Sequence, residues 1–205
     1  MRSGRTHWRG LMIRSTMVVV MLFLLVASSA RADSSCADDI KAPGEIRPFI
    51  PAGTCLLALE TADLNGDNLT DYLIVLETNG NDGGERSLLI ITRWKDGSLK
   101  LAKRNDRAVY CSSCGGMMGD PFQGISAGRK SFSISHYGGS AWRWSVTTRF
   151  NYSRRDDTWQ LVLVQTDSFH VSDPEQGRSI RHIPPRDFGK IDVADFDPKT
   201  YWNQK

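Results

Sequence analysis

The sequence contains little that would hold the protein in a membrane. Its longest apolar run, MVVVMLFLLVA at residues 17–27, is well short of the roughly 20 residues that a membrane-spanning helix needs. Four arginines precede this run, so the start of the chain is basic. The small-x-small sequence Ala30-Arg31-Ala32 follows it, as in a signal peptide. We therefore expect cleavage after Ala32, export to the periplasm or the extracellular space, and no membrane span in the remaining chain.

The chain beyond the leader also lacks an excess of positive charge. The 26 Lys and Arg residues include five arginines within residues 1–32, a segment that has no acidic residue. Without this segment, 21 basic residues face 23 acidic ones, which gives a net charge of −2. Binding to nucleic acid or to an anionic membrane surface requires a concentrated basic face. We therefore expect neither kind of partner.

Cysteine is scarce, and all four cysteines follow the expected cleavage site: Cys36, Cys55, Cys111 and Cys114. Exported proteins fold where disulfides form and persist. Four cysteines allow three connectivities. We expect a Cys36–Cys55 disulfide, which would tie the new N-terminus to the first strand, and a Cys111–Cys114 disulfide within CSSC.

Helical periodicity is rare, and alternating patterns predict a mainly β fold. The clearest case is residues 142–152, where aromatic and β-branched residues alternate with polar ones. YLIVLE (72–77), LLIITRW (88–94) and WQLVLV (159–164) are apolar on both faces, which is typical of strands covered on both sides. Turn sequences divide the chain into two antiparallel four-stranded meanders, near residues 55–62, 71–78, 87–95 and 98–104, and near 123–127, 131–137, 141–152 and 158–167. Two such meanders can form propeller-like blades, a sandwich or a barrel.

These patterns predict one β-rich domain over residues 33–171. The segment 172–205 contains Pro174, Pro184, Pro185 and Pro198. Because proline interrupts regular structure, we expect this segment to be an irregular extension that packs on the domain.

The stretch DLNGDNLTD places oxygen donors at alternating positions before a strongly apolar strand. Asp63, Asn65 and Asp67 offer side-chain oxygens, Leu69 a backbone carbonyl, and Asp71 a further carboxylate. Hard oxygen ligands at this spacing suit Ca²⁺. The alternative interpretation is an acidic turn, since Asp and Asn are common where chains reverse direction. We predict a calcium loop, because spacing, glycine and flanking strands all agree.

This stretch resembles the DxNxDxxxD calcium loop of FG-GAP and VCBS-type repeats over roughly residues 57–76. It departs from an EF-hand, since Ile74 stands where a bidentate Glu belongs. The resemblance implies a structural ion between two strands of a blade, with ligands at Asp63, Asn65, Asp67 and Asp71. The combination of CxxCGG, GDPF and HYGGSxxRW also resembles uncharacterised exported bacterial proteins, which implies no activity.

The sequence CSSCGGMMGDPF permits two further interpretations. A thiol-disulfide protein would use Cys111 and Cys114, although no helix start follows them. A soft-metal site for an ion such as Cu(I) would add Met117, Met118 and His136. We expect a structural disulfide that holds a glycine-rich loop.

The sequence HYGGSAWRW combines His136 and Ser140 without the Gly-x-Ser-x-Gly motif of a serine hydrolase. Tyr, Trp and Arg are frequent anchors of recognition surfaces. His136, Tyr137, Ser140 and Arg143 are therefore a candidate binding surface.

Together these patterns predict an exported, non-enzymatic, calcium-stabilised binding or structural module whose ligand is a protein or a glycan. The alternatives are a periplasmic thiol-disulfide or soft-metal protein, and an inhibitor or immunity-type partner of a secreted protein.

Overall fold

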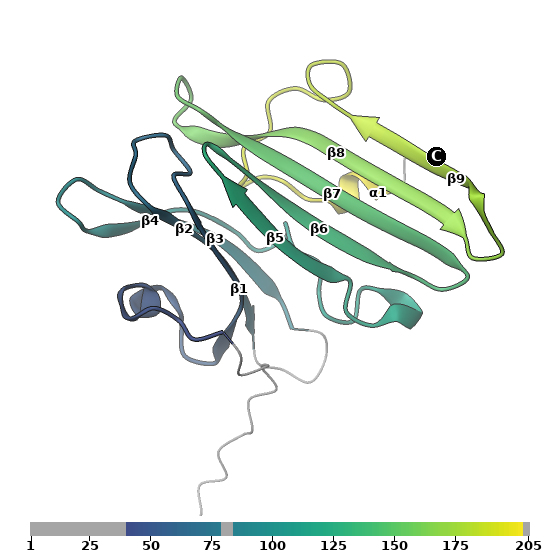
Figure 1. The fold of residues 1–205 in the computed structure, drawn as a ribbon, viewed down its shortest axis with the longest axis horizontal. Helices are drawn as coiled ribbons and strands as arrows, with labels where there is room; N and C mark the ends of the chain where they lie inside the picture. The colour runs from purple at the N-terminus through teal and green to yellow at the C-terminus, as the bar shows by residue number, and fades with distance from the viewer. Residues whose placement is uncertain (1–39, 79–83, 203–205) are drawn as a thin grey trace, which may run out of the picture. The chain divides into compact units, whose positions relative to one another are not determined.

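The computed structural model describes residues 40–78 and 84–202, which form two antiparallel sheets (Figure 1). The first sheet contains β1 (Thr54–Ala62), β2 (Asp71–Thr78), β3 (Arg86–Arg93) and β4 (Leu99–Asn105). The second contains β5 (Phe122–Gly128), β6 (Ser131–Gly139), β7 (Trp142–Ser153), β8 (Thr158–His170) and β9 (Asp173–His182). Each sheet is a meander in which the strands follow their order in the sequence. Three short helical segments complete these elements: η1 (Gly44–Phe49), η2 (Gly116–Met118) and α1 (Lys199–Trp202). The prediction of a mainly β fold is confirmed.

The two central strands of the four-stranded sheet, β2 and β3, are buried on both faces, as their doubly apolar sequences predicted. In β2, Leu73 and Val75 belong to one core cluster, whereas Ile74 and Leu76 belong to another. Successive side chains of a strand point to opposite faces, so both faces of β2 are covered. Ile46 of η1 is fully buried in the second cluster, and η1 therefore covers the outer face of this sheet.

The core between the sheets joins side chains from both of them. Buried residues of β2 and β3 share one cluster with residues of β6, β7 and β8, among them Phe132, Ile134, Val146, Phe150, Trp159, Leu161 and Val164. Within the described residues the strands form no closed barrel. Of the three arrangements that the sequence left open, the sheets fit a β-sandwich.

The five-stranded sheet contains one strand more than we predicted. β9 lies within the segment that we expected to be irregular from residue 172, and it pairs with the long strand β8. Most β9 side chains are exposed, and Pro174 lies near its start. An edge strand needs no apolar alternation, because backbone hydrogen bonds to its neighbour hold it, and it tolerates proline. The prolines of residues 172–205 therefore did not prevent a strand from forming there, contrary to our prediction.

The chain after β9 returns to the core between the sheets. Val193, Phe196 and Tyr201 are buried in the shared cluster. Asn105, at the end of β4, holds this segment, because its Nδ2 donates to the carbonyls of Val193 (2.5 Å) and Phe196 (2.8 Å). The irregular part of the C-terminal segment thus packs on both sheets.

Two predictions concern residues that the structure does not describe. The predicted signal peptide and Cys36 both lie outside the described residues. Within residues 40–78 and 84–202, no helix has the length and apolar character to cross a bilayer.

Candidate metal loop and ligand cavity

The loop between β1 and β2 is fastened to the sheet by Asp71. The carboxylate of Asp71 is completely buried, and its Oδ2 accepts a hydrogen bond from the Leu64 amide (2.9 Å). Its Oδ1 accepts one from the amide of Arg93 at the end of β3 (2.9 Å). Burial raises the pKa of Asp71, an effect that these two bonds oppose. Asp71 therefore joins both ends of the loop to the neighbouring strand.

Asp63 shapes the first half of the loop. Its Oδ1 accepts a hydrogen bond from the Gly66 amide (2.7 Å), and its Oδ2 accepts one from the Asn68 amide (3.1 Å). Gly66 and Asn68 have positive φ angles of 83° and 69°. Glycine and asparagine enter this left-handed region most readily, so the sequence permits the curl.

Asn65 and Asp67 form the second half of the same network. Asn65 Oδ1 accepts from the Asp67 amide (3.0 Å), and Asp67 Oδ1 accepts from the Leu69 amide (2.8 Å). The Asn65 side-chain amide also donates to Asp67 Oδ2 (3.0 Å). Asp63, Asn65 and Asp67 thus shape one hydrogen-bonded loop, whereas the Asp71 carboxylate is directed to the amides of Leu64 and Arg93.

A cationic side chain already contacts this loop. Arg129, in the turn between β5 and β6, places its Nε 3.3 Å from Asp63 Oδ2 and donates from Nη2 to Asn68 Oδ1 (2.9 Å). The side chain of Lys130 covers the loop backbone, because a Cβ at Gly66 would lie 1.9 Å from Lys130 Cε. The loop therefore attracts positive charge from the neighbouring sheet.

The donors suit Ca²⁺ by their chemistry, since they are hard oxygens and each carboxylate oxygen keeps a further lone pair. Their present arrangement is that of a hydrogen-bonded loop. Among the residues described, no three His, Cys, Asp or Glu side chains lie together as a metal-binding group.

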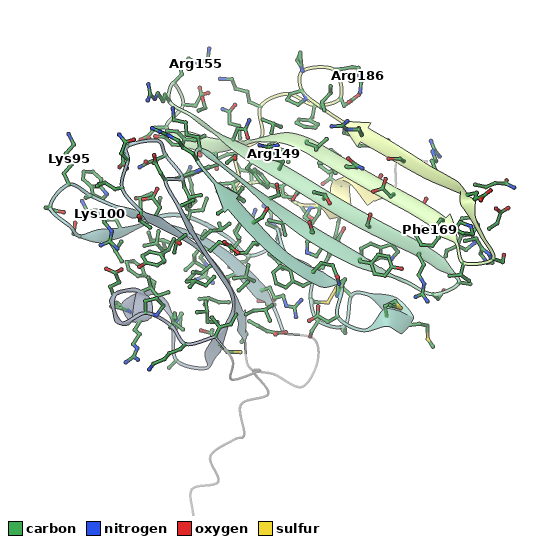
Figure 2. All side chains as sticks on the ribbon, in the orientation of Figure 1. Lys95, Lys100, Arg149, Arg155, Phe169 and Arg186 are labelled. Carbon is green, nitrogen blue, oxygen red and sulfur yellow. A yellow bond between two sulfur atoms is a disulfide. The ribbon has the colours of Figure 1, made fainter. Side chains whose placement is uncertain are left out.

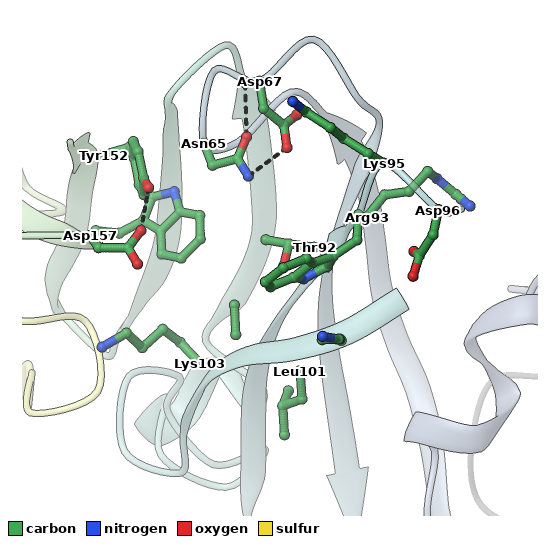
Figure 3. Close-up of a pocket in the computed structure, with 14 residues that line it drawn as sticks. Asn65, Asp67, Thr92, Arg93, Lys95, Asp96, Leu101, Lys103, Tyr152 and Asp157 are labelled. Atoms are coloured by element: carbon green, nitrogen blue, oxygen red, sulfur yellow. Dashed lines mark hydrogen bonds between the residues drawn. The ribbon is translucent and has the colours of Figure 1, made fainter. Parts of the chain in front are cut away.

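A cavity of about 710 Å³ lies beside the loop (Figure 3). Asn65 and Asp67 form one side of it, and Tyr152 and Asp157 lie on another side. The remaining lining residues come from the β3–β4 hairpin and from β8: Thr92, Arg93, Trp94, Lys95, Asp96, Lys100, Leu101, Ala102, Lys103 and Trp159. Figure 2 shows Lys95 and Lys100 on the β3–β4 hairpin. Both sheets and the acidic loop therefore contribute to one cavity.

Three aromatic side chains line this cavity. Trp94 is 53% exposed, and Lys100 Nζ lies 3.7 Å from the centroid of its ring. Trp159 is buried, and its Nε1 donates to the carbonyl of Leu64 in the acidic loop (2.8 Å). Tyr152 donates its hydroxyl to Asp157 Oδ1 (2.5 Å), and burial raises the pKa of Tyr152 to about 12. Tyr152 is therefore a neutral donor at physiological pH.

Ion pairs already neutralise two of the four cations in the cavity wall. Arg93 pairs with Glu45 (2.7 Å), and Lys103 pairs with Asp192 (2.9 Å). Lys95 and Lys100 form no ion pair with another described residue. With the carboxylates of Asp67, Asp96 and Asp157, the wall mixes both signs of charge.

The sequence pattern placed Trp94 at the end of LLIITRW (88–94), a strand expected to be covered on both sides, and it did not indicate the cavity. In the structure β3 ends at Arg93, and Trp94 is 53% exposed. The signal was the sequence TRWKDG, in which a tryptophan follows an apolar strand and immediately precedes a polar turn. The cavity itself depends on the approach of β7 and β8, which no local pattern predicts.

The CSSC sequence forms the predicted disulfide between Cys111 and Cys114, with an S–S distance of 2.09 Å. In this oxidised form the two sulfurs are not thiolates, which are the form that binds soft metals. Met117 and Met118 lie nearby in η2, and both are exposed. The Cys36–Cys55 disulfide stays a prediction, because Cys36 lies outside the described residues.

The candidate surface around HYGGSAWRW requires a correction, because His136 is only 1% exposed. Its Nε2 accepts a hydrogen bond from the Tyr110 amide (3.2 Å), and its ring contacts Tyr110 edge-on (4.6 Å between centroids). Alternation along β6 directs His136 to the core. Ser140 lies exposed in the β6–β7 turn, so the structure places no histidine-activated serine here.

Tyr137 and Arg143 are half-buried on β6 and β7. Register places Tyr137 opposite Ser145 and Arg143 opposite Gly139, so both lie on the face opposite to that of His136. Trp142 is 63% exposed. What remains of the candidate surface is thus Tyr137, Ser140 and Arg143, without His136.

A buried arginine links the two sheets beside the disulfide loop. Arg86 of β3 donates to both carboxylate oxygens of Asp120 (2.7 and 2.5 Å), to Glu77 (3.2 Å) and to the carbonyl of Tyr110 (3.0 Å). Hydrogen bonding and charge attraction from Asp120 keep the pKa of Arg86 above its usual value despite burial. The Arg86–Asp120 pair positions the segment that leads into β5.

No protein-family model, no curated protein and no solved structure matches this chain.

Proposed function

We propose that this protein is an exported, non-enzymatic binding module in which Ca²⁺ bound by the DLNGDNLTD loop stiffens one wall of a ligand cavity. The observation that carries the proposal is that Asn65 and Asp67 belong to both features. They are members of the loop's hydrogen-bonded network, and their side chains line the cavity. An ion that orders this loop would therefore also order the binding surface.

The side chains of Asp63, Asn65 and Asp67 and the carbonyl of Leu69 would hold the ion. Asp71 would be the fifth donor. Each of its carboxylate oxygens already accepts a hydrogen bond, from the amide of Leu64 or of Arg93, so the ion would bind to a remaining lone pair. When bound, Ca²⁺ supplies a double positive charge next to carboxylates that otherwise repel one another. Arg129 now supplies part of that charge.

The cavity supports a binding role because it combines an exposed indole with side chains that both donate and accept hydrogen bonds. Ligand sites are typically concave, partly aromatic, and equipped with a few polar groups that fix orientation. The volume of about 710 Å³ lies within the range of such sites.

Thermal unfolding of the chain without residues 1–32, with Ca²⁺ and with a chelator, tests the ion. At a hundredfold excess over the dissociation constant, binding to the native state should add about 2.7 kcal/mol to the free energy of unfolding. The variant Asp63→Ala/Asp67→Ala should lose this gain. A melting temperature that is equal with Ca²⁺ and with chelator would leave the loop an acidic turn and remove the calcium part of the proposal.

Arg129→Gln provides a sharper test of the same site. Removing the guanidinium beside Asp63 should tighten Ca²⁺ binding about threefold, because an exposed charge pair contributes less than about 1 kcal/mol. Calorimetric titration with Ca²⁺ measures the change. Arg155→Gln is the matched control, since Arg155 is an exposed arginine that contacts Asp156 in a different turn. Weaker Ca²⁺ binding by Arg129→Gln would contradict competition between Arg129 and the ion.

A further inference from the structure

We infer that the cavity between the β3–β4 hairpin and the β7–β8 hairpin binds a neutral oligosaccharide, with Trp94 as the surface on which a sugar ring stacks. This inference rests on the proposed binding function and specifies its ligand class. It follows from the aromatic side chains, the polar groups and the charge of the cavity wall.

The aromatic side chains match the apolar face of a sugar ring. Hexopyranose rings present C–H groups on at least one face, and the electron-rich face of an indole attracts such polarised hydrogens. Trp94 is half exposed at the cavity, and Lys100 Nζ lies 3.7 Å from the centroid of its ring, so the sugar would stack on the part of the indole that Lys100 leaves uncovered. Tyr152 of the five-stranded sheet is partly exposed at the same cavity, whereas Trp159 is buried in its wall. The exposed indole of Trp94 is the main apolar surface of the cavity, and it favours a ligand that has an apolar face.

The polar groups match sugar hydroxyls, which both donate and accept hydrogen bonds. Asn65 offers the second hydrogen of its NH₂ group, because its carbonyl oxygen is assigned to the ion, and Thr92 offers a hydroxyl. Asp67 and Asp157 accept, whereas Lys95 donates. In Figure 3 these groups surround the cavity from several sides, with Asn65 and Asp67 apart from Tyr152 and Asp157. Such a mixed set suits a ligand that has many hydroxyls.

The charge of the wall argues against a strongly anionic ligand. Glu45 and Asp192 neutralise Arg93 and Lys103. The remaining charged residues are Lys95 and Lys100 against three carboxylates. A polyanion would meet as much repulsion as attraction, whereas an uncharged sugar avoids both.

The chain offers a matched control in Trp142, the other strongly exposed tryptophan of the described residues. Trp142 begins β7, whereas Tyr152, which lines the cavity, lies at the other end of that strand. The ring of Trp142 contacts His170 edge-on (5.2 Å between centroids). The two tryptophans therefore differ in position rather than in exposure.

The test is titration of the chain without residues 1–32 with neutral hexasaccharides of glucose (α-1,4 and β-1,4), mannose, galactose and N-acetylglucosamine. Saturation-transfer NMR and calorimetry, at up to about 10 mM sugar, cover weak affinities. At least one hexasaccharide should bind. Trp94→Ala should weaken that binding about tenfold, as expected for loss of an aromatic contact, and Trp142→Ala should not change it. Circular dichroism confirms that both variants remain folded.

Three outcomes would overturn the inference: no hexasaccharide binds, Trp94→Ala binds like the unmodified chain, or Trp142→Ala weakens binding equally. Binding of polygalacturonate or of a peptide library in place of the neutral sugars would also overturn it. Calcium-dependent stabilisation without sugar binding removes the inference and leaves the calcium part of the proposed function intact. Sugar binding that chelator and Asp63→Ala/Asp67→Ala leave unchanged removes the role of calcium and retains the inference.

Discussion

At the scale of single residues, His136 is a titratable side chain that is almost completely buried. It is buried between aromatic rings, and Arg86 is close enough to repel a positive charge on the imidazole. Burial, with a smaller contribution from Arg86, lowers the pKa of His136 to about 4. The neutral ring accepts the Tyr110 amide, so protonation would also remove that acceptor.

This environment predicts acid sensitivity. The unfolded chain binds a proton at His136 near pH 6.5, and the folded chain does so only near pH 4. Since the unfolded state holds more protons in this window, the free energy of unfolding falls as the pH falls from about 6.5 to about 4. Between pH 7 and pH 5 the loss from this residue should be about 2 kcal/mol.

Denaturant unfolding of the unmodified chain and of His136→Gln at both pH values measures that loss. Gln retains an acceptor for the Tyr110 amide and does not titrate. The difference between the two proteins therefore isolates His136 from the other groups that titrate in this range. Equal pH dependence of both proteins would contradict the assignment.

At the scale of the element, the β1–β2 connection is held by one carboxylate. Asp71 satisfies the amides of Leu64 and Arg93, which otherwise would be buried donors without partners. This arrangement couples the acidic loop to the end of β3, directly before Trp94. A change in the acidic loop should therefore also displace the end of β3 and the cavity wall at Trp94.

Asp71→Asn should weaken this connection without changing side-chain volume. An amide group presents only one oxygen, so one of the two backbone donors loses its acceptor and faces an NH₂ group. The free energy of unfolding should fall by about 1–3 kcal/mol, the cost of a buried unsatisfied donor. Urea unfolding in chelator measures it. Asp173→Asn, at the exposed start of β9, should change stability by less than about 0.5 kcal/mol. A similar loss in both variants would show that Asp71 has no special role.

The strands and the β1–β2 loop show which features of the fold sequence patterns predict well. Alternation and turn residues predicted eight of the strands, because these signals are local. Gly66 and Asn68 are local signals too, since both residue types permit the positive φ angles that the loop has. β9 and the cavity were missed because both depend on partners far away in the sequence. His136 was misassigned because proximity to Ser140 in sequence was given more weight than the alternation of β6.

At the scale of the whole molecule, the core is completed by the C-terminal segment. Phe196 is buried against Phe150 (5.2 Å between ring centroids) and Tyr201 (6.0 Å). Asn105 accepts hydrogen bonds from the amides of Arg107 and Ala108 while it donates to the C-terminal segment. The segment is thus part of the shared core.

Phe196→Ala should therefore lower the free energy of unfolding by about 3–5 kcal/mol, as expected for a buried aromatic residue. Ile183→Ala, at an exposed position of the same segment, should cost less than about 1 kcal/mol. Chemical denaturation measures both variants. If the two costs are similar, the C-terminal segment is only a surface attachment.

The bonds from Asn105 to Val193 and Phe196 span 88 and 91 residues of sequence. A nascent chain cannot form them until residues 193–196 have left the ribosome. Because such distant contacts are slow to form, the core between the sheets should be completed late in folding. Any fragment that ends before residue 193 would leave the space between the sheets open to water, however complete its strands.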